Sequence, residues 1–102
     1  MASRQYRTFR DFYPFYLTEH SRSGTRRLHF AGTLLVLLTL GYALVTQRWG
    51  ALALLPVFGY GFAWLAHFAV ERNRPATFTY PLYSLAGDFR MFADMLRGRV
   101  AF

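Results

Sequence analysis

The chain has 102 residues, which leaves room for one domain covering residues 1–102. It is 54% hydrophobic and 20% aromatic, its net charge of +7 comes from arginine without any lysine, and it contains no cysteine. This composition excludes a disulfide framework and thiolate chemistry, and it leaves nucleic acid or an anionic membrane surface as partners for the positive charge.

The N-terminal segment, residues 6–17, has an aromatic side chain at every third or fourth position, namely Tyr6, Phe9, Phe12 or Tyr13, and Tyr16. This spacing predicts an amphipathic helix at a membrane interface, with Pro14 kinking or restarting it. Residues 21–24 predict a turn, after which Ser23 or Thr25 can cap the next helix. No short apolar run followed by a small-residue cleavage site occurs here, so we expect no secretory signal peptide.

Two long stretches, residues 30–46 and 49–70, contain no Asp, Glu, Lys or Arg. At about 1.5 Å per residue, spans at residues 29–47 and 50–70 each reach across a hydrocarbon core of about 30 Å. The connection between them is so short that the two helices must form an antiparallel hairpin. Small residues in the second span predict close helix approach: Gly59, Gly61, Ala63 and Ala66.

Arginine placement predicts the orientation. Eleven of the twelve arginines flank the two spans and only Arg48 lies between them. Since positive charge is retained on the cytoplasmic side, we expect both termini in the cytoplasm and the chain in the inner membrane of a bacterium. Assigning the arginines to topology leaves little basic surface, so we expect no nucleic acid as a partner.

After the second span, residues 73–75 end the helix and Pro81 begins another. Apolar residues recur at helical spacing up to a C-capping glycine, Gly98, which predicts a second interfacial helix. The predicted fold class is therefore all-α: an integral membrane hairpin of two transmembrane helices, flanked by N- and C-terminal interfacial amphipathic helices. The alternative is a soluble bundle with two fully buried helices, which a chain of this length could hardly cover.

The three histidines of the chain lie at the edges of the two spans. Counted from the tip of the hairpin, His29 is about 19 residues along one helix and His67 about 18 along the other, so at about 1.5 Å per residue they reach nearly the same height. Glu71 lies one α-helical turn beyond His67. His20 can fold back toward them, because a turn separates it from the first span. We therefore expect these side chains to converge at the cytoplasmic boundary.

Three imidazole nitrogens and one carboxylate oxygen suit Fe(II), Mn(II) or Zn(II). A histidine and carboxylate set with open positions favours non-haem Fe(II) and O₂ chemistry. Two further carboxylates, Glu19 and Asp88, can orient a ligand histidine. The predicted metal ligands are His20, His29, His67 and Glu71.

Simpler interpretations exist for the same residues. An interfacial histidine often contacts lipid headgroups, and Glu71 can pair with a neighbouring arginine at a solvated helix end. Arg26 and Arg27 are interpreted first as topology determinants, and Asn73 as a helix terminus. Two other functions also fit: bis-histidine haem binding through His29 and His67, or a non-enzymatic membrane hairpin that acts by interaction.

Four segments of the chain resemble the DUF962, or Mpo1-like, family of small membrane proteins. They are residues 12–20 (FYPFYLTEH), 26–33 (RRLHFAGT), 60–71 (YGFAWLAHFAVE) and 73–78 (NRPATF). The specific features are two histidines separated by eight residues, and a histidine followed four residues later by glutamate and then by a Pro-Ala dipeptide. The resemblance covers nearly the whole chain, from about residue 6 to residue 98.

A fungal member of that family is an Fe(II)-dependent dioxygenase that shortens 2-hydroxy fatty acids by one carbon, with O₂ as co-substrate. The resemblance implies that His20, His29 and His67 bind iron, with Glu71 as a fourth ligand or close catalytic partner. The present chain is much shorter, with two predicted spans in place of about four, so either two copies pair as a homodimer or the short form acts on a different lipid. Residues expected to orient ligands or to bind the substrate carboxylate are Glu19, Arg26, Arg27, Asn73, Arg74 and Asp88.

Overall fold

The computed structural model describes residues 5–102, which are all helical or irregular, without a strand in that range. Two long helices and two shorter ones make up most of it. In chain order the elements are α1 (Phe9–Thr18), α2 (Ser23–Thr46), a second long helix (Trp49–Glu71), η4 (Ala76–Phe78) and α5 (Pro81–Leu96).

The second long helix changes its winding along its length. It consists of η1 (Trp49–Ala53), α3 (Leu54–Pro56), η2 (Val57–Gly61), α4 (Phe62–Leu65) and η3 (Ala66–Glu71), of which η2 and η3 are π-helical. The first π-helical segment directly follows Pro56, which has no N–H to donate to the preceding turn. π-helical turns are rare and occur often at functional sites, and the second of these segments contains His67.

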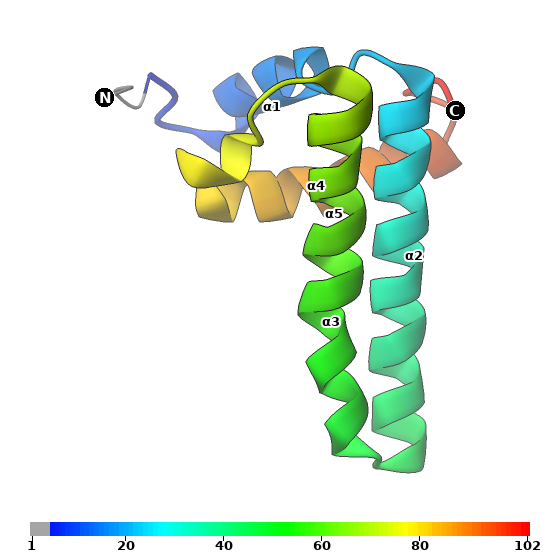
Figure 1. The fold of residues 1–102 in the computed structure, drawn as a ribbon. Helices are drawn as coiled ribbons and strands as arrows, with labels where there is room; N and C mark the ends of the chain where they lie inside the picture. The colour runs from blue at the N-terminus through cyan, green and yellow to red at the C-terminus, as the bar shows by residue number, and fades with distance from the viewer. Residues whose placement is uncertain (1–4) are drawn as a thin grey trace.

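The two long helices lie side by side and run in opposite directions (Figure 1). Gln47 ends α2 in the left-handed conformation, with φ of 58°, and Arg48 completes the connection. Both helices are long and apolar enough to cross a membrane, and only 28% and 17% of their most apolar windows are buried by the rest of the protein. In a soluble bundle these helices would be mostly buried, so the structure does not favour that alternative.

The two long helices pack closely at Gly32 of α2. A Cβ atom there would lie 2.7 Å from the carbonyl oxygen of Phe58 and 2.9 Å from the Cβ of Phe62, so only glycine fits. Of the small residues predicted to allow close packing, Ala63 and Ala66 are buried. The prediction was wrong for Gly61, which faces open space.

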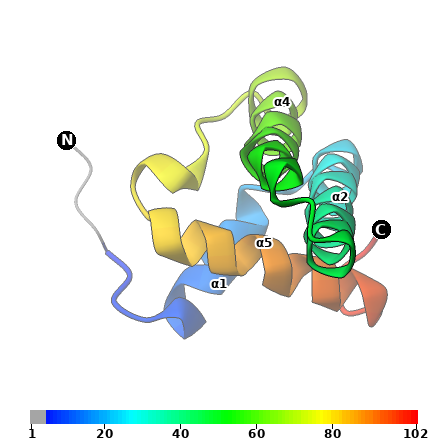
Figure 2. The same cartoon turned by 90° about the horizontal axis from the view of Figure 1, so that it is seen from below.

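Helices α1 and α5 lie across the end of the pair where α2 begins, and α5 contacts both α1 and α2 (Figures 1 and 2). Thr8 caps α1 by accepting a hydrogen bond from the Asp11 amide, and Pro14 lies inside α1 without ending it. The buried core of the protein is at this end, and it is largely aromatic: Phe12, Tyr16, Ala76, Tyr80, Met91 and Met95.

The C-terminal end of α5 has the predicted cap, whereas the N-terminal end of α2 does not. Gly98 follows α5 with φ of 74°, its N–H donates to Met95, and the Arg99 N–H donates to Asp94, which is the predicted glycine cap. The cap predicted at Ser23 or Thr25 was wrong. Helix α2 begins after Arg22 without a capping side chain from its own segment.

Candidate metal centre

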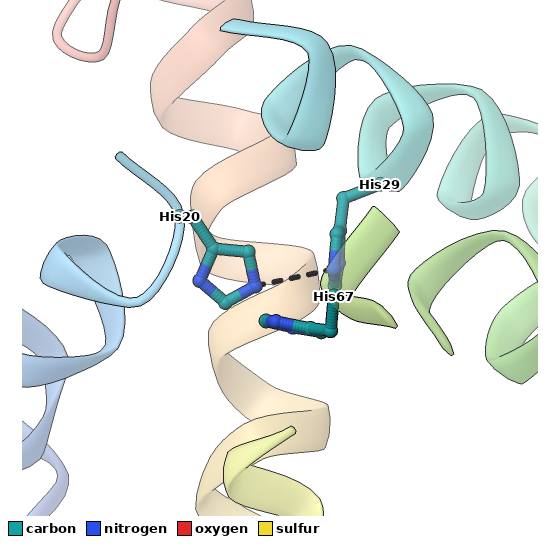
Figure 3. A group of neighbouring side chains, drawn as sticks. All are labelled: His20, His29 and His67. Carbon is teal, nitrogen blue, oxygen red and sulfur yellow. Dashed lines mark hydrogen bonds between the residues drawn. The ribbon is translucent and has the colours of Figure 1, made fainter. Parts of the chain in front are cut away.

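The three histidines converge on one point at the end of the helix pair (Figure 3). His20 comes from the turn after α1, His29 from the second turn of α2, and His67 from the π-helical segment η3. They are 2%, 5% and 2% exposed, and one ring nitrogen of each lies within 4.8 Å of the others. The convergence expected from equal heights on the two helices is therefore present in the structure.

The Nδ1 atom of each ring faces a hydrogen-bond acceptor. His20 Nδ1 is 2.7 Å from the carbonyl oxygen of Tyr16, and His67 Nδ1 is 2.7 Å from Asn73 Oδ1. His29 Nδ1 is 3.3 Å from the Asp88 carboxylate. Because these acceptors are carbonyl and carboxylate oxygens, they favour the tautomer in which each Nδ1 carries the hydrogen and each Nε2 keeps a free lone pair.

The resulting lone pairs are aimed at one another. His20 Nε2 and His29 Nε2 are 3.1 Å apart, and two unprotonated nitrogens at that distance repel unless a proton or a cation lies between them. Burial, and next the proximity of His29, lower the pKa of His20 well below its ordinary value, which opposes the proton. The donor set therefore fits a divalent metal ion bound by neutral imidazoles.

The residues that contact the Nδ1 atoms are themselves held by hydrogen bonds, as is usual for the residues around metal-binding histidines. Asn73 Nδ2 donates to the backbone oxygen of Glu19 at 3.2 Å and to its carboxylate at 3.1 Å, which fixes the Asn73 oxygen toward His67. Asp88 faces His29 directly. Asp88 is thus placed to orient His29, and Glu19 is placed to orient His67 through Asn73. Asn73 therefore has a role beyond ending the helix.

Tyr16 is a supporting residue that the sequence alone places only on the aromatic face of α1. Its hydroxyl donates to Asp88 at 2.5 Å, and its ring stacks on His20 with a centroid distance of 4.0 Å. Burial and the Asp88 carboxylate raise the pKa of Tyr16, so the hydroxyl stays protonated and remains a donor. A Cβ on Gly87 would lie 2.8 Å from the Tyr16 ring, so this arrangement also requires that glycine.

The structure places Glu71 beside the centre rather than in it. Its carboxylate accepts hydrogen bonds from the backbone and hydroxyl of Ser21, from the backbone of Arg22 and from the hydroxyl of Thr25. It therefore caps α2 from the neighbouring helix. Its two oxygens are taken up by these donors, which lie just before α2 and in its first turn, whereas the group that could hold a metal consists of the three histidines.

The arginines near the centre contact other parts of the chain. Arg26 donates to the backbone oxygens of His20 and Ser21, which holds the turn that carries His20. Arg27 donates to the backbone oxygen of Phe102, and Arg74 lies over the Phe78 ring. In this structure Arg26 is a positioning residue, while Arg27 contacts Phe102 and Arg74 contacts Phe78.

Fold and site together define a class: a small helical protein with two apolar helices of membrane-spanning length and, at one end, a buried cluster of three histidines that could hold a metal ion. Residues 6–100 match the family model described as "2-hydroxy-palmitic acid dioxygenase Mpo1-like", and the chain belongs to this Mpo1-like family. No curated protein and no solved structure matches the chain significantly. The family resemblance seen in the sequence is thereby confirmed.

Proposed function

We propose that this chain is a membrane-embedded, Fe(II)-dependent dioxygenase that shortens a 2-hydroxy fatty acid by one carbon. The observation that carries the proposal is the convergence of three buried imidazoles whose Nδ1 atoms all face acceptors. The family description, which names a 2-hydroxy-palmitic acid dioxygenase, supports the substrate class.

His20, His29 and His67 would hold the iron, and the ion would supply the redox chemistry by which O₂ cleaves the bond between C1 and C2. The chain's own part is to keep the three imidazoles neutral, to fix their orientation through Tyr16, Asn73 and Asp88, and to keep bulk water away by burial. Glu71 contributes by holding the His20 turn against the start of α2.

The same proposal places α2 and the helix Trp49–Glu71 across the bilayer, with both termini and the metal centre at the cytoplasmic surface. Large apolar side chains exposed along the pair support this placement, among them Leu38 at 60%, Val45 at 84% and Val57 at 58%. The amphipathic helices α1 and α5 then lie at the interface.

Haem binding between His29 and His67 has less support. The His20 ring packs against both, with centroid distances of 4.3 Å and 4.6 Å. It occupies the space that a macrocycle between the two rings would need. An absorption spectrum of the purified protein tests this directly, because a Soret band would contradict the non-haem proposal.

Elemental analysis of protein purified in detergent, for wild type and His67→Ala in parallel, tests the metal centre. We expect about one iron per chain in the wild type, none in the variant, and one-carbon shortening of 2-hydroxypalmitic acid with O₂ by the wild type alone. Zinc in place of iron would shift the function toward hydrolysis or structure. No metal after anaerobic Fe(II) loading would leave a non-enzymatic membrane hairpin as the better account.

A further inference from the structure

An apolar groove of about 400 Å³ lies beside the metal centre, bounded by α2, the second long helix and α5. Side chains of Val36, Leu40 and Leu55 line it together with Gly59. The volume is in the range of small-molecule sites, and the walls are almost entirely apolar. Figure 2 shows α5 crossing next to the two long helices, and its residues Leu85, Asp88 and Phe89 line the third side of the groove.

One end of this groove meets the histidines. Tyr60 and Asp88 line both the groove and a cavity of about 10 Å³ that the three histidines also line. Along α2 the groove extends from Thr33 to Leu40, which is seven residues and so about 10 Å at about 1.5 Å per residue. It is polar at the metal centre and apolar elsewhere.

Ser84 of α5 is an independent sign that a ligand binds at the polar end. It is 3% exposed, it lines the histidine cavity, and its hydroxyl is the one buried side-chain polar atom of residues 5–102 that has no hydrogen-bond partner. A helical serine commonly donates back to the carbonyl four residues earlier, and a buried hydroxyl without a partner is costly. A polar atom of a ligand, or a water, that enters this cavity would satisfy it.

We propose that the groove is the acyl-chain site of the enzyme and that the Ser84 hydroxyl hydrogen-bonds the polar head of the bound 2-hydroxy fatty acid. The inference rests on the proposed function for the identity of the head. The occupant is a single-chain amphiphile, because the site combines one buried polar contact with a long apolar wall. Its tail enters sideways from the bilayer that surrounds the two long helices.

Gly59 controls how much of the tail fits. A Cβ at Gly59 would lie 3.6 Å from Val36, so the position tolerates a small side chain, whereas a leucine would fill the groove. Gly61, two residues away on the same helix, has nothing within 4 Å of its added Cβ and does not line the groove. Gly59→Leu and Gly61→Leu therefore form a matched pair of variants.

Ser84→Ala tests the polar contact. Removing a hydrogen bond to a carboxylate lowers the affinity for 2-hydroxypalmitic acid by about tenfold, while the thermal stability of the ligand-free protein stays equal or rises because the hydroxyl has no partner there. Unchanged affinity in Ser84→Ala would show that Ser84 does not contact the head.

Photolabelling of the metal-free protein in nanodiscs tests the groove without requiring activity. The probe is 2-hydroxypalmitic acid with a diazirine at its methyl end, and labelled residues are mapped by mass spectrometry. We expect labels at Leu40 and Leu55, reduced at least fivefold by Gly59→Leu but unchanged by Gly61→Leu. A probe carrying the diazirine next to the carboxylate should label residues near Ser84 instead.

The proposal would be overturned if the labels spread over outward-facing residues such as Leu38 and Val45 and Gly59→Leu had no effect. That result would show ordinary partitioning of the probe into the bilayer. If the groove is labelled but the protein binds no iron, the result would support the acyl-chain site and contradict the proposed dioxygenase function. An iron-loaded, active enzyme that is labelled outside the groove would support the dioxygenase and contradict the acyl-chain site.

Discussion

The two ends of the helix pair are built on different principles. The histidine end comprises α1, α5, residues 23–33 and residues 63–71, and it holds the buried core, the three histidines and most side-chain hydrogen bonds described in the structure. The distal half, residues 34–62, exposes large apolar side chains such as Leu38, Leu44 and Val57. One end is stabilised by the protein's own contacts, whereas the other presents an apolar surface.

The largest expected effect at the histidine end is the loss of a ligand. His29→Ala should abolish metal binding, because the two imidazoles that remain give an incomplete ligand set. The measurement is iron content together with calorimetric titration of Fe(II) under anaerobic conditions. A variant that still binds about one iron per chain would show that the metal is held elsewhere.

Asn73→Ala should lower metal affinity by about 10- to 100-fold without abolishing binding, because His67 keeps its place but loses the partner of its Nδ1. Asn73→Asp, which keeps an acceptor at the same position, should restore most of the affinity. Equal affinities in all three proteins would mean that Asn73 only ends the helix.

Gly32→Ala should destabilise the pair by about 1–3 kcal/mol, because the new methyl group would overlap the Phe58 carbonyl. The matched control is Gly41→Ala in the same helix, where nothing lies within 4 Å and alanine should stabilise the helix by up to about 1 kcal/mol. Thermal unfolding in one detergent compares both variants with the wild type. A Gly32→Ala protein as stable as Gly41→Ala would contradict the close approach.

Low pH should reduce the stability of the histidine end, because it protonates Asp94. Burial alone would raise the pKa of Asp94, but hydrogen bonds from Tyr13, Arg90 and Arg97 outweigh it and lower the pKa. A lowered pKa means that the ionised carboxylate adds stability above its unfolded value of about 3.9, and that this stability is lost as pH falls from there toward the folded pKa.

The measurement for Asp94 is the stability of the wild type and Asp94→Asn as a function of pH. The difference, about 2 kcal/mol at neutral pH, should shrink as the pH falls below about 4. A difference that does not change with pH would assign the effect of the substitution to packing rather than to charge.

The smallest effect is expected in the distal half. Leu44→Ala and Val45→Ala should leave metal affinity unchanged, because these side chains are 57% and 84% exposed and lie far along α2 from the histidines. Calorimetric Fe(II) titration in nanodiscs checks this. A clear loss of metal affinity would show that the histidine end and the distal half are coupled, which would contradict their independence.

Much of this protein follows from its sequence. Uncharged stretches of the right length fix the two long helices, helical rise brings His29 and His67 to the same height, and a turn lets His20 join them. Each of these inferences depends on local periodicity, which is a property of consecutive residues. The family motifs carry the same information.

The tertiary structure alone decided the surroundings of the centre. Glu71 caps α2, because the folded chain brings Ser21, Arg22 and Thr25 within hydrogen-bond distance of its carboxylate. Tyr16 and Ser84 joined the site because α1 and α5 pack across the same end of the pair. Helix winding and the packing of distant segments depend on contacts between residues far apart in the chain, and sequence spacing does not encode those contacts.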